Sequence, residues 1–301
     1  MNSSKIRITA DEASVRAVGY ILIFLFGMCC IIPFWLVVAS SFADEQSIIR
    51  NGYMLWPSEL SLDAYKWVLR NPQRILTAYA STALITVVGT CISVVFTVMT
   101  GYVLSRRDFP WANQFSLFFF FTTLFSGGLV PWYIWCTKYL MLKDSYLGRI
   151  LPLLFSVWNI IIAKNYMKSI SYEITESAKI DGATDLVIFV RLIFPLAKPL
   201  VATLALFSAL GFWNDWYYSM LFIRTESKQS LQYFLQDMLS SAKALKQLAA
   251  QGQVQAVSIA DLPTETMKMA MTCVVTGPII FLYPLLQRHF VKGLTIGAVK
   301  G

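Results

Sequence analysis

The sequence has 301 residues, of which 56% are hydrophobic and only 14% are charged, against about 45–50% and 25% in an ordinary soluble domain. Its mean hydropathy of +0.58 excludes a water-soluble enzyme, because a chain of this size cannot hide so much apolar surface inside itself. The net charge of +8 does not indicate nucleic-acid binding, since the basic residues are scattered through the loops. We therefore predict a multi-pass protein of the cell membrane, with the lipid bilayer as part of its surroundings.

Stretches without charged residues locate the membrane spans, because a charge at the bilayer centre costs about 3 kcal/mol on insertion scales. Three such stretches are long, and a fourth is just sufficient: 17–43, 75–105, 109–137 and 269–287. The first is longer than the roughly 7–15 apolar residues of a secretion signal, so we expect it to stay as an anchor.

Two further spans are weaker. One runs from residue 150 to 163 between Arg149 and Lys164, whose long side chains are expected to extend outward to the membrane surface. The other follows Pro199 and is interrupted by Asp215, an ionisable group that is expected to face a cavity or a partner rather than lipid.

The sequence thus predicts an all-α membrane protein with six transmembrane helices in one domain, residues 17–289. Short tails precede and follow this domain, over residues 1–16 and 290–301. The expected spans are 17–40, 76–105, 112–136, 147–167, 198–223 and 267–288. Six spans place both termini on one side, but Lys and Arg are almost equally divided between the two sides, so charge alone does not orient the chain.

The loop between the fourth and fifth spans, residues 168–195, has a helix–turn–helix pattern. Ser171 is placed to cap the first helix, and Gly182 can adopt the left-handed conformation that ends it. Thr184 is placed to cap a second helix that stops before Pro195. We expect a two-helix unit that projects from the membrane.

Within this loop, Glu176-Ser177-Ala178, then Gly182, then Ile193-Phe194-Pro195 resemble the EAA loop of ABC importer permeases. The neighbouring residues 181–184 and the C-terminal stretch 283–301 are similar to those of carbohydrate-uptake permeases of the maltose type. Two more stretches, 125–131 and 213–216, extend the resemblance over most of the chain, closest to the subgroup that imports complex or acidic oligosaccharides. Ser177 departs from the family's alanine, but serine is also small.

The resemblance implies a type I ABC importer permease fold with both termini in the cytoplasm. It implies that the loop docks on a separate ATPase subunit and converts closure of that subunit into movement of the spans. The residues assigned to this coupling are Glu176, Ser177, Ala178, Asp181, Gly182, Ala183 and Pro195. The small residues 177, 178 and 183 would permit close approach of the partner, Ile174 and Ile180 would offer apolar contact, and Glu176 would accept a charge-assisted hydrogen bond.

The implied partners are a second homologous permease subunit, an ABC ATPase dimer, an extracytoplasmic sugar-binding protein and an oligosaccharide, for which acidic and neutral sugars are both candidates. The chain has no phosphate-binding G-x-x-x-x-G-K-[ST] loop, so we expect it not to be an enzyme, with ATP and magnesium bound by the ATPase. Its single histidine, His289, excludes a two-histidine metal site, and no cofactor or catalytic residue is expected. The alternative is an ion-coupled secondary sugar carrier that needs no ATPase, for which Asp215 is the available acid.

Candidates for the substrate path combine flat aromatic faces with polar groups, as sugar binding requires. They are Trp213, Asn214, Asp215, Trp216, Tyr217, Trp158 and Asn159. An aromatic belt at the headgroups explains the Trp and Tyr residues equally well, and hydrogen bonding between helices explains Asn159.

Two further features are a segment rich in glycine and proline and a long loop. Gly127, Gly128 and Pro131 predict a kink and a close helix crossing. The long loop 224–268, with a predicted helix over 240–256, is the expected contact for the sugar-binding protein.

Overall fold

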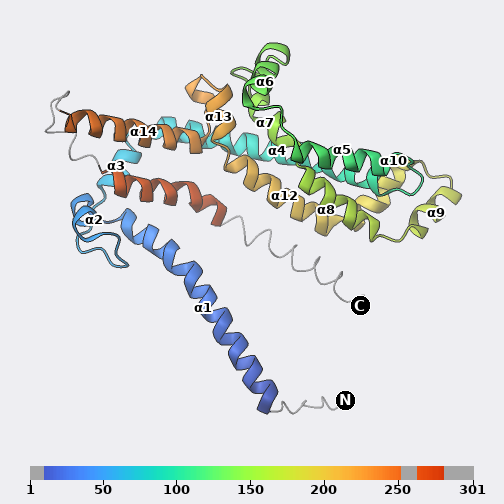
Figure 1. The fold of residues 1–301 in the computed structure, drawn as a ribbon, viewed down its shortest axis with the longest axis horizontal. Coiled ribbons are helices and arrows are strands. Elements are labelled where there is room, and N and C mark those ends of the chain that lie inside the picture. The colour runs from blue at the N-terminus through green and yellow to red at the C-terminus, as the bar shows by residue number, and fades with distance from the viewer. Residues whose placement is uncertain (1–9, 252–262, 281–301) are drawn as a thin grey trace. The chain divides into compact units, whose positions relative to one another are not determined.

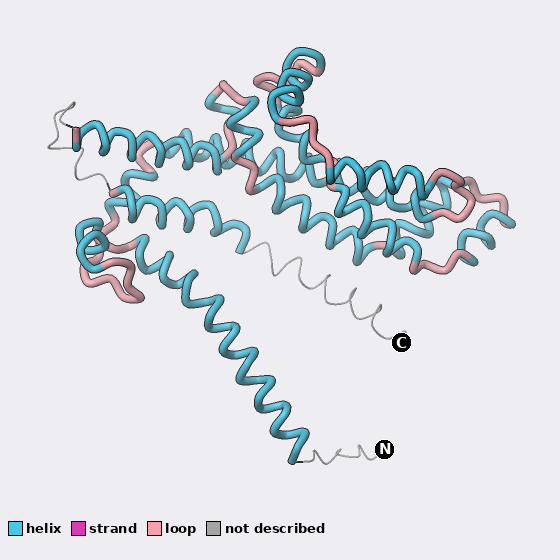
Figure 2. The backbone as a smooth tube through the Cα atoms, viewed as in Figure 1, coloured by secondary structure: helices cyan, strands magenta, loops and turns pink. Residues whose placement is uncertain are grey.

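A computed structural model describes residues 10–251 and 263–280 of the chain. These residues are mostly helical, and apart from an isolated bridge between Ala43 and Leu60 the described part of the chain has no β-structure (Figures 1 and 2). The prediction of an all-α protein is therefore confirmed for the described residues. The chain divides into two compact units, residues 1–70 with 239–276, and residues 71–238 with 277–301.

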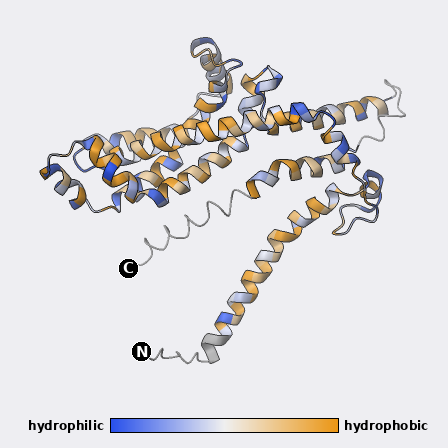
Figure 3. Ribbon diagram, turned by 180° about the vertical axis from the view of Figure 1, so that it is seen from behind, coloured by the Kyte–Doolittle hydropathy of each residue, from blue (hydrophilic) through white to orange (hydrophobic). Residues whose placement is uncertain are grey.

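The first unit begins with α1 (Ala10–Ser41), which is long and apolar enough to cross a membrane. At about 1.5 Å per residue its 32 residues extend for about 48 Å, and they start earlier than the predicted position 17. Figure 3 shows apolar residues along most of its length, and its large side chains are exposed, as at Phe26 (73%). Such a helix needs lipid or another protein around it.

Two short helices follow α1 in this unit, α2 (Glu45–Asn51) and α3 (Asp63–Val68). The later part of α14 (Leu231–Ala250) and a helix over 264–280 complete it. The predicted helix 240–256 is thus part of a longer helix that begins at Leu231, while residues 252–256 and the end of the sixth predicted span lie outside the described residues.

Glu45 joins distant parts of the first unit. Its carboxylate is buried and accepts hydrogen bonds from the backbone N–H of Glu265 (3.0 Å) and Thr266 (2.9 Å), and from Thr266 Oγ1 (3.0 Å). Lys246 Nζ lies 3.6 Å from the same carboxylate. A negative group at these free N–H donors caps the helix over 264–280 and opposes the positive end of its dipole.

The second unit is built around α4 (Pro72–Ser105), a 34-residue helix that begins with proline at its first turn and has no proline inside it. Four α-helices of the described residues pack on α4, with α8 and α12 making its most extensive contacts (Figure 1). These are α5 (Ala112–Leu124), α7 (Tyr146–Leu154), α8 (Val157–Lys168) and α12 (Lys198–Trp213).

Two glycines of α4 permit the close packing. A Cβ atom at Gly101 would lie 2.5 Å from the Cβ of Ala163 on α8, and one at Gly89 would lie 2.6 Å from the ring of Phe212 on α12. The backbones of α4 and α8 therefore approach closely at Gly101, and Gly89 leaves room for the ring of Phe212.

Several predicted spans are bent rather than continuous. The chain turns by 113° between α5 and the stretch formed by α6 (Leu129–Ile134) and the π-helical turn η1 (Trp135–Tyr139). It turns by 48° between α7 and α8, and by 80° between Asp185–Leu196 and α12. Counted by length and composition, the described residues hold two helices able to cross a membrane singly, or up to five spans if each bent pair is one.

The kink predicted at Gly127, Gly128 and Pro131 is confirmed by the first of these bends, where Gly128 has φ +88°. The close helix crossing predicted there is wrong for the described residues, because no atom lies within 4 Å of a Cβ built at Gly127. The interruption predicted at Asp215 is also confirmed, since α12 ends at Trp213 and α13 (Tyr217–Phe222) begins after a break.

Candidate functional site

The loop 168–195 forms the predicted pair of helical segments. The first is α9 (Glu173–Ile180), and after a turn come α10 (Asp185–Ile188), the π-helical turn η2 (Phe189–Ile193) and α11 (Phe194–Leu196). Gly182 has φ +80°, as predicted, and the next residue, Ala183, donates its N–H to the carbonyl of Ala178 (2.9 Å). This left-handed residue closes the C-terminus of α9.

The predicted ends of these helices differ in detail. Ser171 does not cap α9, which begins after Tyr172 without a side-chain cap, and Thr184 precedes α10 without a capping hydrogen bond from its side chain. The second segment also continues through Pro195 rather than stopping before it. Proline is tolerated there because it occupies the first turn of α11, where its missing N–H is not needed.

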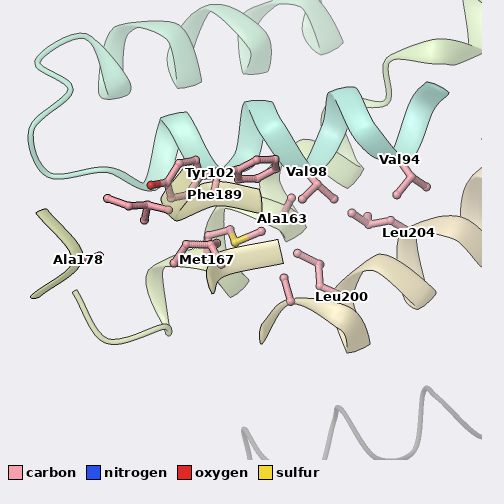
Figure 4. Close-up of a cluster of buried hydrophobic side chains, with 12 residues drawn as sticks. Val94, Val98, Tyr102, Ala163, Met167, Ala178, Phe189, Leu200 and Leu204 are labelled. Carbon is pink, nitrogen blue, oxygen red and sulfur yellow. The ribbon is translucent and has the colours of Figure 1, made fainter. Parts of the chain in front are cut away.

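An apolar core attaches this hairpin to the bundle (Figure 4). Ala178 and Phe189 of the hairpin pack with Tyr102 of α4, Met167 of α8 and Leu200 of α12. The ring centroids of Tyr102 and Phe189 are 5.2 Å apart. Movement of the hairpin is therefore resisted by direct contact with three helices of the bundle.

The core also includes two of the small residues assigned to coupling. Ala178 is 8% exposed and the half-buried Ala183 packs against the core, so both alanines contact the chain's own bundle. Ser177 is exposed, as are Glu176, Asp181, Gly182 and Pro195. Periodicity did not separate these roles, because alanine fits a tight internal contact and an open surface equally well.

The hairpin also has large apolar side chains that are exposed. Ile180 is 86% exposed, as the expected apolar contact requires, whereas Ile174 is half-buried. Leu186 (67%) and Val190 (54%) are exposed too, and sequence reasoning missed them. Their position directly after the turn was the available signal.

A group of four charged residues, here named the turn cluster, joins the hairpin to the short turn between α4 and α5. Asp108 of that turn accepts hydrogen bonds from Arg106 Nε (2.7 Å) and from Lys179 Nζ of α9 (2.8 Å). Arg106 Nη1 also lies 2.7 Å from Asp185 Oδ1. The bonds from Arg106 and Lys179 hold the pKa of Asp108 well below its usual range, and the bond to Asp108 raises the pKa of Lys179.

At the other end of α4 the structure pairs Asp215 with Arg149. Arg149 Nε donates to Asp215 Oδ2 (3.2 Å), and their side chains are 0% and 2% exposed. Arg149 Nη1 donates to Ser81 Oγ of α4 (3.0 Å) and to the carbonyl of Lys228 (3.1 Å). The expectation that Arg149 extends to the membrane surface is thus wrong, because a buried acid supplies a better partner inside the chain.

Asp144 makes a second set of polar contacts, five residues before Arg149 in the sequence. Its carboxylate accepts from Thr225 Oγ1 (2.6 Å) and the Thr225 N–H (2.9 Å), and Lys228 Nζ lies 3.2 Å away. These bonds, with that from Thr225 Oγ1 the strongest, hold the pKa of Asp144 below its usual range. The segment before α7 is thereby fastened to the segment after α13.

The seven substrate-path candidates fall into two groups. Trp158 and Asn159 line a cavity of about 380 Å³ between α8 and α12, together with Leu153, Ser156, Phe207, Ser208 and Gly211. The other five lie at the break after α12 and do not line it. Among those five, Asp215 is buried against Arg149, and the amide oxygen of Asn214 accepts from Gln232 Nε2 (3.2 Å).

The three aromatic candidates at the break differ in their surroundings. Trp213 lines a separate, smaller apolar cavity of about 50 Å³, and its ring centroid is 6.3 Å from that of Tyr79. Trp216 is 46% exposed and meets Tyr217 edge to face. His289 and the C-terminal stretch 283–301 lie outside the described residues.

Known proteins share both this fold and its sequence pattern. The family described as "Binding-protein-dependent transport system inner membrane component" matches residues 93–296. Protein LplC of Bacillus subtilis (strain 168) is 38% identical over 277 residues, which cover 91% of each chain. The polygalacturonan/rhamnogalacturonan transport system permease protein YtcP of the same organism is 35% identical over 284 residues, 94% of this chain and 96% of YtcP.

A solved structure is similar over almost the whole chain. It is described as the crystal structure of a bacterial ABC transporter involved in the import of the acidic polysaccharide alginate. One of its chains matches with a TM-score of 0.75 and 28% sequence identity, covering 94% of this chain and 98% of that one.

Proposed function

Because this chain belongs to the family of binding-protein-dependent transport system inner membrane components, we propose that it is the membrane-spanning permease subunit of an ATP-driven oligosaccharide importer. The observation that carries the proposal is the family match over residues 93–296, which includes the hairpin with its exposed Glu176. The permease forms half of the translocation path. It is the transport subunit and not the ATPase, so its energy comes from a partner.

The hairpin from α9 to α11 is the coupling element of this permease. Its exposed Glu176, Ser177 and Asp181 dock in a cleft of an ABC ATPase dimer, with Ile180 as the apolar contact. ATP and magnesium bind to that dimer. Closure of the dimer pulls the hairpin, and the core on α4, α8 and α12 carries the movement into the bundle. Gly182, Ala183 and Pro195 belong to the same coupling element, and Ala178 holds it to the bundle.

The fold is of the type I permease class. Six spans over residues 17–289 place both termini and the hairpin in the cytoplasm. The other partners are a second homologous permease subunit and an extracytoplasmic sugar-binding protein, which the loop 224–268 contacts.

The ion-coupled secondary carrier has little support from the site. It needs an acid free to gain and lose a proton or to bind an ion in the membrane. Asp215, the acid that the sequence offered for this role, is buried and paired with Arg149. Its contacts are those of an anchor between helices.

An acidic oligosaccharide is the proposed substrate class. YtcP is named for polygalacturonan and rhamnogalacturonan, and the similar solved transporter imports alginate. On this chain the cavity between α8 and α12 is the proposed place of contact, with the Trp158 face for sugar C–H groups and Asn159 and Ser208 for hydroxyls.

The coupling proposal is tested by Gly182→Pro in the full complex, reconstituted in vesicles with both permease subunits, the ATPase and the binding protein. Proline fixes φ near −65° and cannot adopt the observed +80°. We expect loss of ATP-driven sugar uptake with a normal amount of the permease in the membrane. Gly182→Asn is the matched control, since asparagine tolerates the left-handed conformation. Normal uptake by Gly182→Pro would reject the coupling role.

The substrate proposal is tested with a sugar panel. Oligogalacturonate should stimulate ATP hydrolysis by the complex more than maltodextrin does, and Trp158→Ala should raise the sugar concentration needed for half-maximal uptake. Trp111→Ala, which alters an exposed tryptophan at the start of α5, is the control. Equal stimulation by both sugars contradicts the acidic substrate class, and an unchanged Trp158→Ala contradicts the proposed path.

A further inference from the structure

The turn cluster connects two segments that are far apart in the sequence. Asp108 lies in the short turn between α4 and α5, and Lys179 lies 71 positions later in α9. One carboxylate oxygen, Asp108 Oδ2, is shared by Lys179 and by Arg106 Nη2. The hairpin is therefore held to this turn by charge as well as by the apolar core.

The cluster is balanced and partly buried. It contains two positive groups, Arg106 and Lys179, and two negative groups, Asp108 and Asp185. The side chain of Arg106 is 14% exposed, and those of Lys179 and Asp108 are 39% and 38% exposed. An isolated surface ion pair contributes little, whereas a network with shared, partly buried partners fixes a geometry.

The cluster rests on the apolar core below it. The guanidinium of Arg106 lies 5.8 Å from the ring centroid of Tyr102, and Tyr102 packs on Phe189 and in the same core as Ala178 (Figure 4). The ion pairs and the apolar packing therefore both restrain the contact between the hairpin and the end of α4. A shift of α9 relative to α4 would break both.

The turn cluster lies at the C-terminal end of α4, and the Arg149–Asp215 pair lies near the N-terminal end of the same helix. Arg106 follows the last residue of α4, and Ser81 of the same helix accepts a hydrogen bond from Arg149. Ser81 and Ser105 are about 36 Å apart at 1.5 Å per residue. A continuous helix over this distance can carry a displacement from the hairpin to the Arg149–Asp215 pair.

We propose that Asp108 is a positioning residue for energy coupling: through Lys179 it locks the hairpin to the end of α4, so that ATPase closure moves α4 together with the hairpin. The proposal rests on the proposed function. It adds a route through the turn between α4 and α5, beside the covalent connection from the hairpin into α12.

The test measures sugar taken up per ATP hydrolysed by the full reconstituted complex. Asp108→Asn removes the charge with little change in shape, and we expect it to lower this ratio by about fivefold, the low end for coupling between sites, while ATP hydrolysis continues. Lys179→Gln should lower it to a similar extent. Asp108→Glu and Lys179→Arg keep the charges and should retain most of the ratio.

A double-mutant cycle separates a joint role from two independent effects. Asp108→Asn with Lys179→Gln should be no worse than the more impaired single variant. Asp63→Asn is the control, because Asp63 pairs with Lys66 on an exposed surface of the first unit.

Two outcomes would overturn the proposal: unchanged uptake per ATP in both single variants, or losses that multiply in the double variant. If Asp108→Asn lowers the amount of complex in the membrane, the proposal is tested by uptake per ATP in Lys179→Gln and Lys179→Arg. If the unmodified complex shows no ATP-dependent uptake, the proposed function itself fails, whatever the variants do.

Discussion

The Arg149 guanidinium is the most deeply buried charge among the described residues, and its environment explains why Asp215 interrupts a membrane span. Asp215 Oδ2 accepts from Arg149, and Asp215 Oδ1 accepts from the N–H of Tyr218 (2.9 Å), so each oxygen has a donor. Two charges out of water need such partners, because the desolvation of each is costly; Arg149 Nε and Nη1 have them, whereas Nη2 has none among the described residues. The pair thereby fixes how α4, α7 and the start of α13 meet.

Removing one member of this pair should be severe. We expect Arg149→Met to lower the free energy of unfolding by about 3–5 kcal/mol, because it leaves Asp215 buried and unpaired. Thermal unfolding in mild detergent measures the effect. Lys66→Met, which breaks the exposed pair with Asp63, should have a much smaller effect, because solvent screens that pair. Similar losses in both variants would show that the burial of Arg149 is not what matters.

The turn cluster should be insensitive to pH through the physiological range. The pKa of Asp108 is lowered, so its contribution is present above its unfolded pKa near 4 and is lost as pH falls through the lower folded pKa. The pKa of Lys179 is raised, so its contribution is present below its unfolded pKa near 10 and is lost as pH rises through the higher folded pKa. Between about pH 5 and 9 both charges persist.

The measurement compares uptake per ATP in the unmodified complex and in Asp108→Asn at several pH values. The uptake per ATP of the unmodified complex, divided by that of Asp108→Asn, should stay constant between about pH 5.5 and 8.5, inside the window set by the two pKa shifts. If this ratio approached one toward pH 6, the role of the Asp108–Lys179 pair would be contradicted, since neither residue titrates there.

Individual residues show the limits of sequence reasoning. Asp215 was identifiable as significant because a charge in a span is rare, and Gly182 because its position demands a left-handed turn. The partners of Asp215 and Asp108 could not be inferred. Each comes from an element 66 or 71 positions away, and the choice of partner depends on how helices cross rather than on local pattern.

At the scale of elements, helix existence was predictable and helix continuity was not. Charge-free length located α1 and α4, and the Gly-Gly-x-x-Pro segment located the 113° bend. The 48° bend between α7 and α8 is marked more weakly, by Pro152 inside α7 and by Ser156, whose hydroxyl accepts a hydrogen bond from the N–H of Asn159 and caps α8. These signals do not give the bend angle, because it depends on how α7 and α8 pack on α4.

The crossing of α4 and α8 gives an element-scale prediction. Gly101→Ala would place a Cβ 2.5 Å from that of Ala163 and 3.0 Å from backbone atoms, none of which can rotate away. We expect a loss of about 1–3 kcal/mol in the free energy of unfolding, despite the better helix propensity of alanine. Gly27→Ala in α1 has open space around it and should be neutral or stabilising. Equal stability of the two variants, measured by thermal unfolding in detergent, would contradict the close crossing.

At the scale of the whole molecule, much of the apolar surface has no partner within the described chain. No residue of α5 is buried, and Leu117 on it is 68% exposed. In the proposed importer, lipid and the second permease subunit cover this surface. Composition alone predicted that need, but it did not predict which helices would be left outside, because all the spans are similarly apolar.

Orientation is the corresponding whole-molecule prediction. In a variant whose five cysteines are replaced, single cysteines at Ser58 and Ser171 place exposed thiols in the loop after α1 and in the hairpin. A membrane-impermeant maleimide should label Ser58→Cys in intact cells. It should label Ser171→Cys only after the cells are opened. Labelling of Ser171→Cys in intact cells would reverse the proposed topology and remove the hairpin from reach of a cytoplasmic ATPase.

The contacts of Glu45 have a consequence for the order of biosynthesis. Its carboxylate is satisfied by Thr266 and Glu265, which are 221 and 220 positions later in the chain. While the ribosome is still producing the middle of the protein, that acid lacks these donors, although Asp44 can already cap α2. We expect the native setting of Glu45 to form only when translation is nearly finished, and chains that stop short of residue 266 to leave its carboxylate without these partners.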